Sequence, residues 1–135
     1  MNTELHTPVI KQYLEIKARH KDSFVFFRMG DFYELFFEDA VKASEILNLT
    51  LTKRGKSGGE HVLLAGVPVH SSNRYIKTLL AHGKTIAICE QVEDSKPGKG
   101  LVKREVVRIL TDGTIYEEEL ILSLIHISEP TRRNS

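Results

Sequence analysis

The strongest constraint on the fold is an apolar run near the start of the chain, Phe24-Val25-Phe26-Phe27. A short, unbroken run of aromatic and β-branched residues predicts a buried strand. Gly30-Asp31 then interrupts the pattern, as turn residues do, and the aromatic character resumes from Phe32 to Phe36. This run is therefore expected to form a buried strand, around which the rest of the chain is organised.

Capping residues and apolar spacing predict three helices, which begin near residues 8, 38 and 72. Thr7-Pro8 combines a hydroxyl N-cap with proline, and this helix runs to about residue 19 or 20. Glu38-Asp39 places acids where the dipole of a second helix favours them, and that helix ends near residue 48. Ser71 or Ser72 caps the third, and Gly83 ends it. The expected inner faces are Ala40, Val41, Ser44 and Leu47 in the second helix, and Tyr75, Ile76, Leu79 and Leu80 in the third.

The remaining segments supply further strands. Residues 49–52 and 62–65 are expected to form a hairpin around a long, basic, glycine-rich turn at residues 53–59. The continuous apolar run at residues 85–89 predicts a strand at the centre of a sheet. Residues 102–110 predict a strand with one solvated face, and Asp112-Gly113 predicts a turn. The fold class is therefore α/β of the α+β type, with a mixed sheet of about five or six strands flanked by about three helices.

Phe32 and Glu34 form the first candidate site. In an extended segment, residues two apart project from the same face, so the ring and the carboxylate are expected side by side. That pair suits recognition of nucleic acid, because a ring can wedge between stacked bases and an acid can hydrogen-bond an exposed base edge. The alternative is an aromatic residue in the core beside a glutamate that reaches solvent. The pattern alone leaves both interpretations open.

Short segments spread in order over roughly residues 5 to 121 follow the pattern of one family. They are Thr7-Pro8, Gln12-Tyr13-Leu14, Lys17-Ala18, Phe27-Arg28-Met29-Gly30-Asp31-Phe32-Tyr33-Glu34-Leu35-Phe36, Leu51-Thr52-Lys53-Arg54-Gly55, Ala65-Gly66-Val67-Pro68, Ala87-Ile88-Cys89-Glu90-Gln91, Val106-Val107-Arg108-Ile109 and Gly113-Thr114. On these residues the chain resembles the N-terminal mismatch-recognition domain of the MutS family of bacterial DNA mismatch-repair sensors. The resemblance implies that Phe32 inserts and stacks at a mispaired base while Glu34 hydrogen-bonds that base.

The predicted basic turn is the second candidate site. Lys53, Arg54 and Lys56 lie beside glycines that allow close backbone approach, which suits contacts to DNA phosphates. A solvated hairpin tip is the alternative, and the resemblance favours the DNA contact because residues 51–55 match a segment that lies near DNA in the family. Lys103 and Arg104 are left out, since the family has an acid where Lys103 stands. The formal net charge of +1 shows no overall basic character, so any DNA contact must come from local arrangement.

The sequence gives no reason to expect a catalytic or cofactor site in this chain. Gly55-Lys56-Ser57 and Gly83-Lys84-Thr85 imitate a P-loop, but Thr50 and Thr78 stand where its first glycine is required. By resemblance, ATP and magnesium belong to missing domains of a full-length protein, so this chain is expected not to be an enzyme. Two alternatives stay open: a protein-interaction module that buries the aromatics in a partner, and a small metal-dependent nuclease. Acids for the nuclease would come from Asp31, Glu34, Glu90 and Glu93.

The expected partners are mismatched double-stranded DNA, the remaining MutS domains and a second subunit, with no membrane. No apolar run approaches membrane-spanning length, and no basic leader with a cleavage site opens the chain. Cys89, the only cysteine, sits in an apolar run and is expected to be a small buried hydrophobe. These features predict a cytoplasmic protein.

The expected domain spans residues 1–121, with a flexible start at 1–6 and the beginning of a linker to a missing second domain at 112–121. The last fourteen residues, 122–135, match nothing in the family. They look like the translation of a transposase adapter used in sequencing libraries, and we expect them to be a non-native tail. A natural, divergent tail is the alternative.

Overall fold

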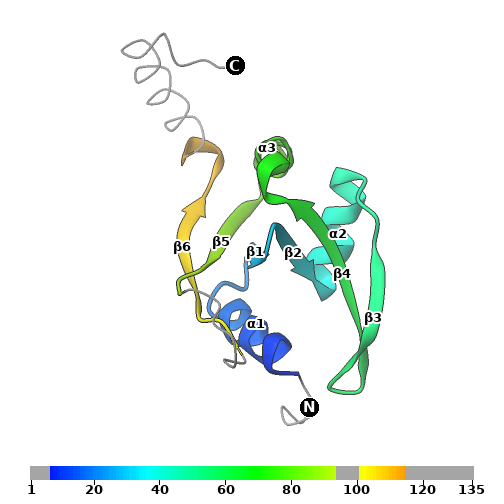
Figure 1. Cartoon of the computed structure of the whole chain (residues 1–135). Helices are drawn as coiled ribbons and strands as arrows, with labels where there is room; N and C mark the ends of the chain where they lie inside the picture. The colour runs from blue at the N-terminus through cyan, green and yellow to red at the C-terminus, as the bar shows by residue number, and fades with distance from the viewer. Residues whose placement is uncertain (1–6, 94–100, 115–135) are drawn as a thin grey trace.

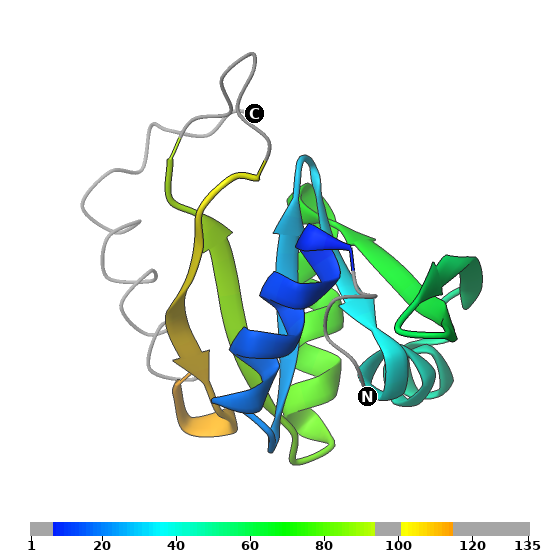
Figure 2. The same cartoon turned by 90° about the horizontal axis from the view of Figure 1, so that it is seen from below.

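A computed structural model of the chain describes residues 7–93 and 101–114. Within these ranges a mixed six-stranded sheet runs in the order β3-β4-β2-β1-β5-β6 (Figure 1). The α1 helix lies on one face, and α2 and α3 lie on the other (Figure 2). The predicted fold class is confirmed. The elements are α1 (Pro8–Ala18), β1 (Ser23–Met29), β2 (Phe32–Phe36), α2 (Phe37–Leu47), β3 (Thr52–Ser57), β4 (Glu60–Pro68), the short 3₁₀ helix η2 (Val69–Ser71), α3 (Ser72–Ala81), β5 (Thr85–Gln91) and β6 (Arg104–Leu110).

The predicted buried strand is β1, in the interior of the sheet. It pairs antiparallel with β2 and parallel with β5. Because side chains alternate along a strand, Phe24 and Phe26 pack toward α2 and α3, whereas Val25 and Phe27 pack toward α1. All four side chains are buried. This run therefore contributes to both halves of the core, which explains its unbroken apolar character.

The helix ends largely follow the predictions. The Thr7 hydroxyl accepts a hydrogen bond from the Ile10 amide at 3.4 Å, as an N-cap does. Gly83 has a φ of +79°, and hydrogen bonds from Gly83 N to Leu80 O and from Lys84 N to Leu79 O close α3. Ser71 stands at the N-cap position of α3, but its hydroxyl donates to Pro68 O instead of capping the helix.

The inner face of α2 differs from the prediction. Ala40 is buried as expected, but Ala43 and Asp39 complete the buried face, while Val41 and Ser44 are half-buried. Asp39 turns inward because Lys17 Nζ lies 3.0 Å from Oδ1 and the Val25 amide donates to Oδ2 at 3.1 Å. Because Asp39 has these partners, its charge can be buried. The buried face of α2 therefore includes Asp39, which apolar spacing alone does not indicate.

The predicted basic turn is wrong. Lys53, Arg54 and Lys56 lie within β3, and the turn is the following pair Gly58-Gly59, because Ser57 already pairs with Glu60. The predicted strand at residues 49–52 starts only at Thr52. β3 tolerates the charges because it is an edge strand with exposed side chains. Gly55, with a φ of +44°, stands where the register shifts between Arg54 and Lys56, as in a β-bulge.

Other expectations fall partly outside the described residues. The start at 1–6, most of the expected linker and the whole tail at 122–135 lie there, as do residues 94–100. Within the described part, β6 forms the predicted strand at the other edge of the sheet, and Cys89 is buried. No helix in the described ranges combines the length and the apolar character that a membrane crossing needs.

Candidate nucleic-acid interface

The β1–β2 hairpin presents Phe32 at its tip. Met29 pairs with Phe32 across the two-residue turn Gly30-Asp31, and Gly30 adopts a φ of +66° that favours glycine. The Val69 amide donates to Asp31 O at 2.9 Å, which ties the turn to the end of β4. Phe32 nevertheless keeps 43% of its surface exposed. An aromatic ring at a tethered tip is available to a ligand, whereas the other aromatics of this hairpin are buried.

Glu34 shares a face with Phe32. Tyr33 and Leu35 pack into the core beneath α2 and α3, so the alternation of β2 directs Phe32 and Glu34 to the α1 side. Among the described residues, Glu34 Oε1 is a buried atom with no hydrogen-bond partner. Burial raises the pKa of Glu34, and the positive charge of Arg54 partly opposes this rise. The Oε1 atom of this half-buried side chain is therefore shielded from solvent and lacks a hydrogen-bond partner among the described residues.

Glu34 lines a cavity of about 410 Å³ on the α1 side, which we call the inner hollow. Apolar side chains of α1, β2 and β4 form most of its wall, and Arg54, Gly55 and Lys56 of β3 complete it. The residues lining the inner hollow are Thr7, Val9, Ile10, Met29, Glu34, Phe36, Arg54, Gly55, Lys56, Val62 and Leu64. The structure thus brings Glu34, Arg54 and Lys56 together from distant parts of the sequence.

The other two predicted site residues lie apart from the inner hollow. Lys53 pairs with Leu63, one position along from the Arg54–Val62 pair, so Lys53 faces the opposite side of the sheet from Arg54. Phe32 lines a second cavity of about 440 Å³ at the hairpin tip. The wall of this cavity comes from the end of β1, the turn, the start of β2 and the β4–η2 junction. That cavity is lined by Arg28, Asp31, Phe32, Pro68, Val69 and His70.

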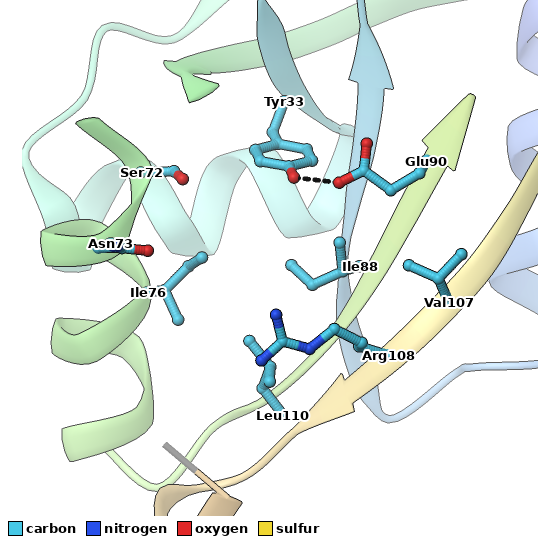
Figure 3. Close-up of a pocket in the computed structure, with 9 residues that line it drawn as sticks. All are labelled: Tyr33, Ser72, Asn73, Ile76, Ile88, Glu90, Val107, Arg108 and Leu110. Atoms are coloured by element: carbon cyan, nitrogen blue, oxygen red, sulfur yellow. Dashed lines mark hydrogen bonds between the residues drawn. The ribbon is translucent and has the colours of Figure 1, made fainter. Parts of the chain in front are cut away.

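A polar brace that the sequence did not reveal holds the hairpin. Arg28 Nη1 lies 2.8 Å from Glu90 Oε1. The Tyr33 hydroxyl donates to Glu90 Oε2, as Figure 3 shows. Arg28 Nε also donates to Gly30 O at 2.6 Å, within the turn itself. Burial, followed by the hydrogen bond to Glu90, raises the pKa of Tyr33 to about 12. The Tyr33 hydroxyl therefore keeps its proton at neutral pH, and its hydrogen bond to Glu90 ties the strand that carries Phe32 to β5.

Glu90, one of the acids considered for the nuclease alternative, is therefore part of this brace. Both of its oxygens are engaged, by Arg28 and by Tyr33. Glu90 lines a small cavity of about 130 Å³ between β2, α3, β5 and β6, on the face opposite α1. Figure 3 shows the residues that line it. The available signal in the sequence was the family segment Ala87-Ile88-Cys89-Glu90-Gln91, in which an acid directly follows a run of apolar residues.

Arg104 forms a second brace on the α1 side. Its guanidinium lies over the Phe27 ring, 4.7 Å from the centroid, and donates to Arg28 O and Gln12 Oε1 at 2.7 and 2.6 Å. These contacts join α1, β1 and β6. Excluding Arg104 from the DNA-binding candidates agrees with this internal position, since the side chain is buried.

Comparison with known proteins assigns the sequence of this chain to a family. The sequence model of the family described as MutS domain I matches residues 7–119. A protein of Halalkalibacterium halodurans is 60% identical over 118 residues, which cover 87% of this chain and 14% of the relative. A protein of Listeria welshimeri is 57% identical over 113 residues, which cover 84% of this chain and 13% of the relative. A protein of Myxococcus xanthus is 56% identical over 115 residues, which cover 85% of this chain and 13% of the relative. All three are named DNA mismatch repair protein MutS. The chain spans about one seventh of the length of these relatives.

Proposed function

The chain belongs to the MutS domain I family, and on that premise we propose that it recognises mispaired bases in double-stranded DNA as the reading domain of a MutS-type repair sensor. The observation that carries the proposal is the exposed Phe32 ring at the tip of a braced hairpin, with Glu34 on the same face. A core role for Phe32 does not fit that exposure. The neighbouring aromatic rings are buried, so Phe32 is the ring of this hairpin that DNA would contact.

Phe32 would distinguish a mismatch by the cost of deforming the duplex. Stacking of a base on an aromatic ring is worth roughly 1–3 kcal/mol and depends little on which base it is. Unstacking a step costs a few kcal/mol, and less where pairing is already faulty. The ring therefore gains more at a mispaired step than at a paired one. Because the Glu90 brace fixes the strand, the duplex rather than the hairpin has to yield.

Glu34 would add a hydrogen bond to the displaced base. An ionised carboxylate near phosphates is repelled, but burial favours the protonated form, which can donate to a purine nitrogen without bringing a negative charge. The alternative is an ionised group that accepts from a base donor. In either form, Glu34 Oε1 can make a hydrogen bond that no described residue of the protein supplies. A paired base that cannot meet it leaves a buried polar group unsatisfied, which disfavours binding.

The basic residues of β3 would hold the duplex in place. Arg54 and Lys56 lie beside the inner hollow, and Lys53 projects from the other face of the same edge strand. Contacts of this kind to phosphates position a protein without reading sequence. Because the net charge of the chain is only +1, this local group supplies the attraction that the whole domain lacks.

The wider activity belongs, on this proposal, to the full-length relatives. ATP hydrolysis with magnesium, the other MutS domains and the second subunit would complete a clamp around DNA, while this domain performs no catalysis itself. Such a clamp would force the duplex onto Phe32. The isolated chain is accordingly expected to bind DNA weakly.

Fluorescence anisotropy at low salt tests the proposal, because phosphate contacts are strongest there. The chain is titrated into a duplex with one G·T mismatch and into its matched control. We expect a preference for the mismatch that Phe32→Ala abolishes, with a loss of roughly 5- to 100-fold in affinity if stacking is complete. Val107→Ala, which truncates a side chain with 49% exposure on β6, is the control and should keep the preference.

Equal binding of both duplexes by both proteins would contradict the proposal for the isolated domain, and would leave the family membership untouched. The same assay tests the carboxyl group through Glu34→Gln and Glu34→Ala. Unchanged selectivity in both of these variants would remove Glu34 from the recognition site.

A further inference from the structure

We infer that Gly66 is a positioning residue: by lacking a side chain, it leaves the space on β4 in which the Glu34 carboxyl group lies. The inference deepens the proposed function and rests on it where DNA is concerned. Its structural part, the contact between Glu34 and Gly66, can be tested without DNA.

The sheet register places the two residues opposite each other. Glu34 of β2 pairs with Gly66 of β4, and Phe32 pairs with Pro68 two positions along. A Cβ atom added to Gly66 would lie 2.9 Å from Glu34 Oε2, 3.2 Å from Oε1 and 3.3 Å from Cδ. The nearest of these distances is shorter than real Cβ contacts allow. The carboxyl group therefore occupies the volume that any other residue at position 66 would need.

The backbone gives no separate reason for glycine at this position. Gly30, Gly55, Gly58, Gly59 and Gly83 all have a positive φ, where a side chain is strained. Gly66 is not among them, and it lies inside a regular strand, where glycine is generally unfavourable. The requirement at position 66 is therefore one of space, and Glu34 is what fills that space.

The position over Gly66 has consequences for the carboxyl group. Next to the inner hollow, Glu34 Oε1 is shielded from solvent but has no partner among the described residues. Arg54, which also lines the hollow, is the charged residue that acts on it. The site thus holds the Oε1 atom shielded from solvent on the same face as Phe32, in position before a base arrives.

Substitution by alanine should change Glu34 without damaging the fold. The clash involves only the far end of a flexible side chain, which can rotate away. The carboxyl group would then move into solvent, while β4 would keep its pairing with β2 and would gain a residue better suited to a strand. Gly113→Ala is a matched control, because its φ is not positive and its added Cβ would meet Thr111 Oγ1 only at 4.0 Å.

NMR of the full 135-residue chain provides the DNA-free test. In the parent protein, we expect cross-relaxation between the Glu34 Hγ and Gly66 Hα protons and a Glu34 pKa above its ordinary value of 4.5. In Gly66→Ala, the pKa should fall toward 4.5, because the group regains water, and Gly113→Ala should leave it unchanged. An unchanged Glu34 pKa in a folded Gly66→Ala protein would overturn the inference.

A double-mutant cycle connects the contact to binding and to stability. In the parent background, Gly66→Ala should reduce the ratio of mismatched to matched affinity by roughly 2- to 10-fold, the equivalent of one net hydrogen bond. In the Glu34→Ala background it should have no effect on this ratio. Equal effects of Gly66→Ala in both backgrounds, on selectivity or on unfolding, would show that Gly66 acts independently of Glu34 and overturn the inference. Absence of any mismatch preference in the parent protein would instead refute the proposed function, and the NMR result would still decide the contact.

Discussion

Two acidic side chains near α1, each with a shielded carboxylate oxygen, differ in their hydrogen bonding. Asp39 is 6% exposed, and its oxygens receive hydrogen bonds from Lys17 Nζ at 3.0 Å and from the Val25 amide at 3.1 Å. Glu34 Oε1 is also buried, but it has no partner within the described part of the chain. Both acids belong to segments with strong apolar character, and their sequence contexts do not reveal this difference.

The difference separates an acid that stabilises the fold from one that we assign to recognition. Nearly all buried polar groups in folded proteins have a hydrogen-bond partner, so each exception calls for an explanation. Asp39 ties α1 and α2 to β1 and needs nothing further. Glu34 Oε1 has no hydrogen-bond partner among the described residues and lies on the same face as the exposed Phe32. A buried polar atom without a partner lowers stability, and binding sites often have such a cost. Three substitutions test this contrast.

Asp39→Ala should have the largest effect on stability. It leaves the Val25 amide without its acceptor and Lys17 without its counter-charge, and the free energy of unfolding should fall by about 3 kcal/mol. Urea denaturation measures this change. Glu38→Ala is the matched control, because its side chain is 79% exposed and its pair with Lys42 is a surface pair worth little. Equal effects of the two substitutions would contradict the structural role of Asp39.

Glu34→Gln should act in the opposite direction, with a smaller magnitude. Because burial raises the pKa of Glu34 in the folded protein, the folded state holds the proton more tightly than the unfolded state. The stability associated with that proton is fully present below pH 4.5 and is lost as the pH rises through the folded pKa. At pH 7 the uncharged glutamine should therefore raise the free energy of unfolding. The gain should vanish below pH 4.5, and a gain independent of pH would contradict this explanation.

Arg54→Ala should have the smallest effect of the three substitutions, and it tests whether Arg54 acts on Glu34. The charge of Arg54 lowers the pKa of Glu34, so its removal should raise that pKa further. Lys53→Ala is the matched control, since Lys53 lies on the opposite face of β3 and should leave the pKa unchanged. An NMR titration of the Glu34 side chain distinguishes them. Equal shifts in both variants would mean that the electrostatic effect comes from the whole basic strand rather than from the inner hollow.

Local signals predicted much of the fold correctly. Thr7-Pro8 begins α1, Gly83 closes α3, and the run at Phe24 forms a buried strand, because each feature depends on residues close in sequence. The predicted inner face of α2 was correct for Ala40 and Leu47 but missed Asp39, because burial of Asp39 depends on Lys17, 22 residues away. The basic turn was wrong because only the sheet order shows that β3 is an edge strand that can carry charges.

The candidate site was predictable only in part. The period of an extended segment placed Phe32 and Glu34 on one face, and the family resemblance singled them out. The support for the site came from tertiary contacts that no local pattern encodes. Glu90 reaches Arg28 across 62 residues, and Gly66 meets Glu34 only because the register of β2 and β4 aligns them.

An NMR titration of the isotope-labelled chain with duplex DNA tests the central claim most directly. Side-chain signals of Phe32, Glu34 and Asp39 are followed while a G·T duplex or its matched control is added at low salt. We predict that Phe32 and Glu34 shift with the mismatched duplex and much less with the matched one, while Asp39 shifts with neither. Equal shifts with both duplexes, or shifts confined to Lys53, Arg54 and Lys56, would contradict the claim that this face recognises mismatches.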